Sequence, residues 1–243
     1  MCPRLQQKGF HTLRRSRSKV ATHQEIAHLS DEDLVNRMTA AHDDRFDAVF
    51  WSFFDEFVDP HLADTPHIAD VGCGPGLFLR DLRKHYPQAT LFGSDVTGAM
   101  IDYASSVVYA GQKPELTLHD VTKEKLPFED GQMNLISMVA VMHVLDDPFA
   151  VCREIKRAMS DDGIFLLQDW VRTALPDYLD RMTGDVEPDQ REIARGRLLP
   201  LFTVHNKYTL DDWLWLLQEA GFKITEHRQL RSQHFCTFVC RKI

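Results

Sequence analysis

A glycine-rich segment, Asp70–Gly76, carries the strongest chemical signal in the sequence. Its glycines, Gly72, Gly74 and Gly76, allow a sharp turn and let a ligand approach the backbone closely. The segment stands between an apolar run and a helical pattern, so backbone N–H groups at the start of that helix can donate to a ligand. The third glycine comes one residue too early for the dinucleotide motif G-x-G-x-x-G, and Pro75 removes one donor. These departures disfavour an NAD-dependent oxidoreductase.

Two aspartates further along the chain stand where a ligand would meet such a loop. Asp95 follows Gly76 by 19 residues, at the predicted end of the second strand, where its carboxylate can accept hydrogen bonds from both hydroxyls of a ribose. Asp120 ends the third predicted strand, where it can bind the edge of an adenine. Each aspartate alone is equally well explained as a cap. Because both follow consecutive strands, at the edge where open α/β sheets bind ligands, the pair indicates a ligand site.

The elements that must position these residues follow from the apolar pattern after residue 66. Strands are predicted at 67–71, 90–95, 115–120, 134–142 and 164–169, and helices at 77–85, 99–108 and 148–159. Two more strands, 223–230 and 233–241, are separated only by Arg231 and Ser232, which favours an antiparallel pair at one edge. The alternation predicts an α/β fold: a Rossmann-like, seven-stranded, mostly parallel sheet with an antiparallel C-terminal edge strand and helices on both faces.

The residues before this pattern predict a helical cap. Ser30 and Asp33 fit a capping box that opens a helix ending near Ala41, and a second helical stretch follows. An apolar stripe on that second helix is best explained by packing on the core, with a lid over an apolar substrate as the alternative. The stripe consists of Phe46, Val49, Phe50, Phe53, Phe54 and Phe57.

Residues 171–208 break the alternation of strands and helices and are predicted to be an insertion. A further helix follows, which Thr209 and Asp212 open with a capping box and Gly221 ends. The predicted domains are a basic, disordered tail at 1–24, a helical cap at 25–65 and a main domain at 66–243 that contains the insertion.

With these motifs in this order, the sequence resembles the class I S-adenosylmethionine-dependent methyltransferases, especially the branch that acts on small molecules. The resemblance spans residues 66–243 and rests on four segments: Ile68–Gly76, Phe92–Asp95, His119–Val121 and Asn134–Pro148. It implies S-adenosyl-L-methionine as the cofactor, with its methionine portion at the glycine loop, its ribose at the acid after the second strand and its adenine at the acid after the third. The cofactor-binding residues so implied are Asp70, Gly72, Cys73, Gly74, Gly76, Asp95, Val96, Asp120, Val121 and Val139.

The resemblance also singles out His143. The family often has Phe-Asp at the start of the fourth strand and His-His at its end, whereas this chain has Met133-Asn134 and His143-Val144. The remaining histidine is a candidate base or substrate-orienting group, because imidazole titrates near neutral pH. A histidine in an apolar run is, however, more often a satisfied core residue.

Further candidates for the acceptor pocket stand near the insertion. Asp169, Trp170, His205 and Tyr208 are such candidates, and Arg172 is a candidate anchor for a substrate carboxylate, although a surface position explains it better. No metal is expected, because the 12 histidines include no HxxxH pair and no dense cluster of ligand-type residues. The predicted reaction is methyl transfer to an oxygen or nitrogen atom of a small molecule. Protein or tRNA methylation, and non-catalytic binding of the cofactor, are the alternatives.

Charge and composition restrict the partners. The net charge is −8, but residues 1–24 hold six basic and no acidic residues, so the rest of the chain carries −14. An acidic body repels phosphate backbones, which disfavours nucleic acid as a partner. Five cysteines without a CxxC pair fit a reducing compartment, and no apolar run is long enough to cross a membrane. We expect a cytoplasmic monomer or homodimer, with organellar targeting by the basic tail as an alternative.

Overall fold

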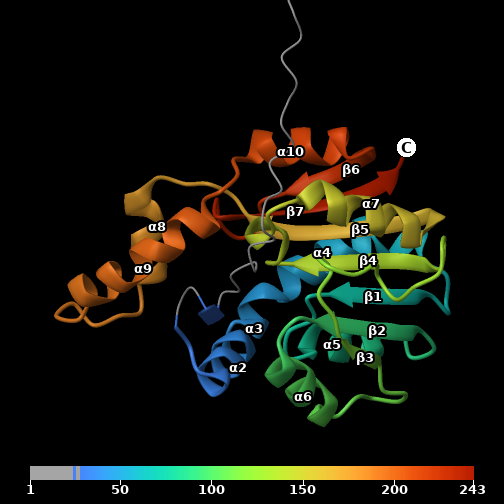
Figure 1. The fold of residues 1–243 in the computed structure, drawn as a ribbon, viewed down its shortest axis with the longest axis horizontal. Helices are drawn as coiled ribbons and strands as arrows, with labels where there is room; N and C mark the ends of the chain where they lie inside the picture. The colour runs from blue at the N-terminus through green and yellow to red at the C-terminus, as the bar shows by residue number, and fades with distance from the viewer. Residues whose placement is uncertain (1–23, 26–27) are drawn as a thin grey trace, which may run out of the picture.

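The computed structural model describes residues 24–25 and 28–243, and Figure 1 shows their arrangement around one central sheet. The tail predicted at 1–24 therefore lies outside the described residues, except for Gln24. The strands are β1 (His67–Val71), β2 (Thr90–Asp95), β3 (Glu115–Leu118), β4 (Met133–Val139), β5 (Met159–Trp170), β6 (Phe222–Arg228) and β7 (Phe235–Lys242).

The seven strands form one sheet in the order β3-β2-β1-β4-β5-β7-β6. Strands β1 to β5 pair in parallel, whereas β7 pairs antiparallel with both β5 and β6. The predicted fold class is thus confirmed, with the antiparallel β6–β7 pair at one edge and β6 as its outermost strand. The strand order reverses between β1 and β4, and open α/β sheets bind ligands at such a switch point.

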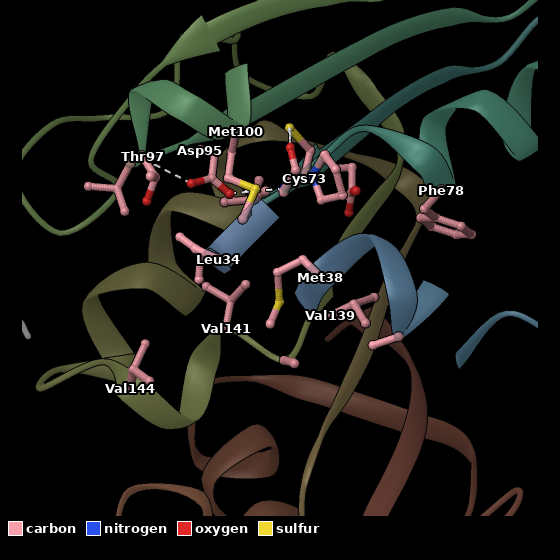
Figure 2. Close-up of a pocket in the computed structure, with 18 of the residues that line it drawn as sticks. Leu34, Met38, Cys73, Phe78, Asp95, Thr97, Met100, Val139, Val141 and Val144 are labelled. Carbon is pink, nitrogen blue, oxygen red and sulfur yellow. Dashed lines mark hydrogen bonds between the residues drawn. The ribbon is translucent and has the colours of Figure 1, made fainter. Parts of the chain in front are cut away.

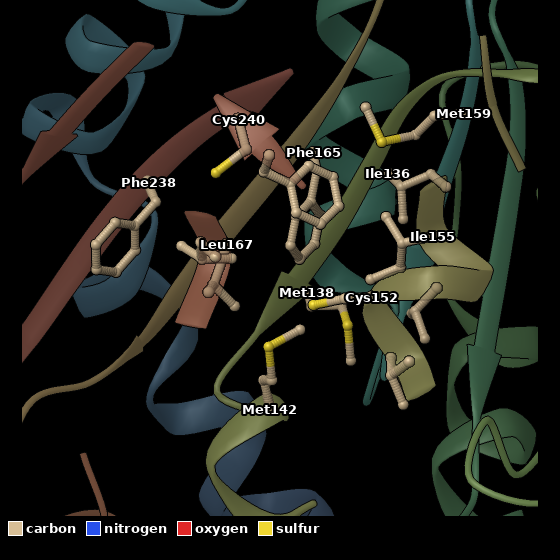
Figure 3. Close-up of a cluster of buried hydrophobic side chains, with 14 of the residues drawn as sticks. Ile136, Met138, Met142, Cys152, Ile155, Met159, Phe165, Leu167, Phe238 and Cys240 are labelled. Carbon is tan, nitrogen blue, oxygen red and sulfur yellow. The ribbon is translucent and has the colours of Figure 1, made fainter. Parts of the chain in front are cut away.

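Helices cover both faces of the sheet, which explains why its central strands are almost continuously apolar. The helices are α2 (Asp31–Ala40), α3 (His42–Arg45), α4 (Ala48–Phe57), α5 (Leu77–His85), α6 (Gly98–Ser106), α7 (Pro148–Ala158), α8 (Leu175–Met182), α9 (Arg191–His205) and α10 (Leu210–Glu219). The side chains of successive strand residues point to opposite faces of the sheet. In β5, Phe165 and Leu167 pack toward α7 and α10. Ile164 and Leu166 pack toward α4 and α5. Figure 3 shows part of the first cluster, between the sheet and α7.

The aromatic stripe before the sheet packs on the core. Phe50, Phe53 and Phe54 of α4 are buried, and the ring of Phe46 stacks on that of Phe78 with 4.3 Å between their centroids. The interpretation as core packing is therefore correct for these three residues of α4, whereas Val49 of the predicted stripe is 46% exposed. The segment before it, α2 and α3, instead contributes side chains to the cavity described below.

Several predicted element boundaries were wrong. Strand β5 begins at Met159, not at 164, and helix α6 ends at Ser106, not at 108. Strand β4 ends at Val139, not at 142, because Ala140 adopts a left-handed conformation (φ 56°) and a short 3-10 helix, η2 (Met142–Val144), follows. Strand β3 ends at Leu118, two residues before Asp120. The predicted two-residue connection between the last strands is longer, because residues 229–234 separate β6 from β7.

The insertion consists of two helices, α8 and α9, which extend from the sheet beyond the ends of its strands in Figure 1. The predicted capping box that follows is present: the Thr209 hydroxyl accepts the Asp212 N–H at 3.1 Å, and the Asp212 carboxylate accepts the Thr209 N–H at 2.7 Å. The indole Nε1 of Trp213 donates to the Trp170 carbonyl at 2.7 Å. This bond joins α10 to the end of β5.

Candidate cofactor and acceptor site

A cavity of about 380 Å³ opens at the carboxyl ends of β1, β2 and β4, beside the point where the strand order reverses. Its wall includes nine of the predicted cofactor-binding residues: Asp70, Gly72, Cys73, Gly74, Asp95, Val96, Asp120, Val121 and Val139. Side chains of α2 and α3 complete it from one direction and those of α8 and α9 from another. Figure 2 shows Leu34 and Met38 of α2 extending into the space bounded by Asp95, Met100 and Val141.

The glycine loop needs glycine for different reasons at its different positions. Gly72, Gly74 and Gly76 all have positive φ, at 79°, 52° and 74°, which disfavours any side chain. A Cβ at Gly72 would lie 2.3 Å from Cγ2 of Val141, whereas one at Gly74 would meet no atom within 4 Å. Gly76 is absent from the cavity wall and instead lets α5 pack closely on Ala104. The loop thus keeps an open cradle at Gly74, beside the cavity.

Asp95 connects this loop to the next strand end. One carboxylate oxygen accepts the Gly74 N–H and the other accepts the Thr97 N–H, both at 2.9 Å (Figure 2). Burial raises the pKa of Asp95, although the hydrogen bonds from Thr97 and Gly74 act in the opposite direction. Each oxygen retains a second lone pair, so the carboxylate can still accept hydrogen bonds from the hydroxyl groups of a ribose.

Asp70 is the most deeply buried acid of the cavity wall, with 4% of its surface exposed. Burial raises its pKa to about 7, against the hydrogen bond that the Ser137 hydroxyl donates at 2.7 Å; Asp95 raises the pKa further and Arg45 lowers it. A ligand ammonium group placed beside Asp70 would favour its charged form.

The raised pKa of Asp70 predicts a pH-dependent stability. An acid whose pKa is higher in the folded state stabilises the protein fully below its unfolded pKa, near 4, and this contribution is lost as the pH rises to about 7. We expect Asp70→Asn, which keeps an acceptor for Ser137, to gain stability relative to the wild type between pH 5 and pH 8. Urea unfolding of both proteins across this range measures the difference, and parallel curves would contradict the assignment.

The loop after the third strand adds polar side chains to the cavity wall. The Asp120 carboxylate accepts hydrogen bonds from the N–H and the hydroxyl of Thr122 and from Lys123. Burial would raise its pKa, but the bonds from Lys123 and Thr122 outweigh burial and lower it. The neighbouring His119 lines the cavity, is 9% exposed and has a ring Nε2 with no hydrogen-bond partner among residues 24–25 and 28–243. No sequence motif assigns a role to His119, and a polar atom of a bound ligand would satisfy this buried nitrogen.

His143 lies behind the cavity wall. Its side chain is fully enclosed: the ring Nδ1 is 2.6 Å from one oxygen of the buried Asp169, whose other oxygen accepts the His143 backbone N–H at 3.1 Å. Neither residue contributes to the cavity wall, whereas Trp170 and His205, which pack against the His143 ring, do. This arrangement holds the end of β5 against η2.

The acceptor end of the cavity combines apolar and cationic side chains. Trp170 and His205 stack with 4.0 Å between ring centroids, and the His205 Nδ1 lies 2.9 Å from the Tyr178 hydroxyl. Three arginines from the covering helices also contribute to the wall: Arg37 of α2, Arg45 of α3 and Arg181 of α8. None of these three was identified from the sequence.

Two other sequence candidates lie outside this cavity. Arg172 is exposed and donates through Nε to the Asn206 carbonyl at 2.9 Å, as its interpretation as a surface residue predicted. Tyr208 packs on Trp213 with 4.6 Å between ring centroids. Neither is part of the cavity wall.

Other chemistry receives less support from the described residues. Burial raises the pKa of the Cys73 thiol well above its usual range, with Asp70 and Asp95 adding to the effect, so this thiol is a poor nucleophile. Within residues 24–25 and 28–243, no three His, Cys, Asp or Glu side chains are grouped as metal ligands would be. In the same residues, no helix is long and apolar enough to cross a membrane.

Comparison with known proteins gives the class. The sequence matches the family described as "Methyltransferase domain" over residues 44–227, more than half of the chain, and the chain therefore belongs to this family. Together with the sheet order and the position of the cavity, this membership places the chain in the family of class I S-adenosylmethionine-dependent methyltransferases. The glycine cradle, the Asp95 carboxylate and the unsatisfied His119 nitrogen fit that cofactor.

Individual relatives vary in how much of the chain they share. The malonyl-[acyl-carrier protein] O-methyltransferase of Legionella pneumophila is 32% identical over 41% of this chain and 34% of its own length. The carboxy-S-adenosyl-L-methionine synthase of Nautilia profundicola is 26% identical over 90% of this chain and 93% of its own. The chain covers 34%, 55% and 39% of the lengths of three curated relatives that it matches. A S-adenosylmethionine-dependent methyltransferase from Aquifex aeolicus shares the fold, with a TM-score of 0.60, 17% identity and coverage of 88% of this chain and 100% of that one.

Proposed function

We propose that this protein transfers the methyl group of S-adenosylmethionine to an oxygen or nitrogen atom of a small molecule. The observation that carries the proposal is the covered cavity: the ligand-binding strand ends face a space of small-ligand size, and helices from two distant parts of the chain close over it. A long polymer or a folded protein would need an open groove in this place. The name of the Legionella relative, an O-methyltransferase, agrees with an oxygen acceptor.

The residues of the chain act mainly by positioning. When bound, S-adenosylmethionine supplies a methyl group on a positively charged sulfur. Asp95 and the cradle at Gly74 would hold the ribose and methionine portions, and His119 would contact the adenine. Asp70 would pair with the amino group of the methionine portion. The apolar covering side chains Leu34, Met38 and Leu201 exclude water, which strengthens polar contacts inside the cavity. Alignment of the two reactants then accounts for much of the rate enhancement.

Ligand stabilisation tests the cofactor directly. A ligand that binds only the folded state raises apparent stability by mass action, so S-adenosylhomocysteine should raise the melting temperature and NAD should not. Transfer of isotope-labelled methyl from S-adenosylmethionine to a small molecule then tests catalysis. Binding without any transfer would favour the non-catalytic alternative, and stabilisation by NAD alone would contradict the proposal.

The position of His143 predicts the result of replacing it. We expect His143→Asn to keep a donor toward Asp169 and to lower kcat/KM less than tenfold, because the ring lies outside the cavity wall. Loss of a general base typically costs 10²- to 10⁴-fold. Rates measured from pH 6 to pH 9 provide the check. A drop of about 100-fold, together with loss of the acidic limb of the pH profile, would show instead that His143 is the base.

A further inference from the structure

Two arginines of the covering helices, Arg45 and Arg181, bring positive charge to the cavity wall. Arg45 is half-buried and Arg181 lies at the exposed rim, and the two come from helices α3 and α8, far apart in the sequence. Within the described part of the chain, neither guanidinium makes a hydrogen bond or ion pair with a carboxylate; Arg181 lies over the Phe235 ring, 5.5 Å from its centroid. Two like charges therefore face one cavity without a direct counter-ion.

The electrostatics agree with this picture. Burial lowers the pKa of Arg45, and the charge of Arg181 lowers it further, against the opposing effects of Asp169 and Asp70. Burial also lowers the pKa of Arg181, which Asp44 raises and Arg231 lowers. Because arginine stays protonated in proteins, the cavity does not relieve this repulsion by losing a proton. An anionic ligand would relieve it.

The side chains of the cavity wall indicate the chemical character of the anion. A guanidinium presents a planar fork of donors that matches a carboxylate. Between the arginines and the strand ends the wall is apolar and aromatic, with Leu34, Met38, Trp170, Leu201 and Phe235. A ligand that satisfies both parts has a carboxylate and an apolar body.

Resting on the proposed function, we propose that the acceptor is a carboxylic acid with an apolar body, that Arg45 and Arg181 bind its carboxylate, and that the product is its methyl ester. One oxygen of the carboxylate forms a bond to the methyl carbon, the carbon–sulfur bond breaks, and its electron pair stays on the sulfur. The acceptor loses its negative charge and the cofactor its positive charge. No proton has to be removed, in accord with the position of His143 outside the cavity wall.

The chemical nature of the product tests the inference. The full-length protein is incubated with S-adenosylmethionine labelled in the methyl group and with straight-chain acids of six to twelve carbons, phenylacetate and cinnamate. Each acid is paired with its primary alcohol and its amide. Mild alkali hydrolyses methyl esters and releases labelled methanol, whereas ethers and N-methyl groups resist it. We expect alkali-labile label from at least one acid and none from its alcohol or amide. Label that resists alkali, or no label from any acid, would overturn the inference.

Arginine variants supply a second readout that does not depend on turnover. In Arg45→Met and Arg181→Met we expect the affinity for the acid acceptor to fall at least about tenfold, as loss of a charge-assisted hydrogen bond implies, while S-adenosylhomocysteine binds within about threefold of the wild type. Arg45→Lys should recover part of the loss, and Arg197→Met, an exposed position of α9, is the matched control. Loss of S-adenosylhomocysteine binding in Arg45→Met would assign that arginine to the cofactor and overturn its role here. Failure of the wild type to bind S-adenosylhomocysteine would instead overturn the proposed function.

Discussion

Replacing Asp95 with alanine is expected to weaken binding of S-adenosylhomocysteine by about 10- to 150-fold, the equivalent of about 1.5–3 kcal/mol. The variant loses the acceptor for ribose hydroxyls, and it also releases the Gly74 and Thr97 N–H groups that the carboxylate holds at 2.9 Å. The loss of affinity thus has two causes: the missing contact to the ligand and the altered conformation of the glycine loop at Gly74. Isothermal titration of the purified protein measures it.

Two companion variants separate these contributions. Asp95→Asn keeps one carbonyl acceptor and should fall between the wild type and alanine. Asp102→Ala changes an exposed acid of the following helix and should leave the affinity unchanged. If Asp95→Ala binds as tightly as Asp102→Ala, then Asp95 does not belong to the cofactor site.

Replacing Gly72 with alanine is expected to reduce the free energy of unfolding by about 2–5 kcal/mol. A left-handed backbone costs an L-residue about 1–2 kcal/mol, and forced overpacking typically costs about 1–3 kcal/mol more. The overpacking arises because the new Cβ would lie 2.3 Å from Cγ2 of Val141, a β-branched side chain with few alternative rotamers. Urea denaturation monitored by tryptophan fluorescence measures the change.

Gly74→Ala is the matched control for this effect. Its φ of 52° is also left-handed, but the new Cβ would meet no atom within 4 Å. The free energy of unfolding should therefore fall only by the cost of the left-handed backbone. Adding Val141→Ala to Gly72→Ala should restore much of the difference, because it removes both γ-carbons. Equal destabilisation by the two glycine replacements would contradict the steric explanation.

The strands and the strand-end residues of the cavity wall were predictable because local sequence determines them. Apolar runs bounded by glycine and proline define the strands, and the residues at their carboxyl ends meet wherever a parallel sheet forms. The sequence alone therefore predicts that Asp70, Asp95 and Asp120 lie at one edge of the sheet. The end of β4 was mispredicted because hydropathy continues past Val139, whereas the backbone turns at Ala140.

The acceptor half was predictable only in part: Trp170 and His205 were candidates and line the cavity wall, but its arginines were not identified. Arg45 and Arg181 stand in no motif, and only the packing of α3 and α8 brings them to one cavity. His143 is the opposite case, a residue that the sequence suggested for the site but that lies outside the cavity wall. Its residue type and place after the fourth strand suggested a catalytic side chain, but the chain folds so that its ring faces Asp169. Side-chain direction after a strand depends on a turn that the sequence pattern does not encode.

The two parts of the cavity wall are built from separate portions of the chain. The sheet and its glycine loop supply the portion assigned to the cofactor, while α2, α3, α8 and α9, which contribute no strand, supply the covering portion. If the proposed function is correct, we expect the covering helices to be replaceable for a different acceptor without changing the strand-end residues assigned to the cofactor. Arg181 and Leu201, which both belong to the insertion, are the first positions for such engineering.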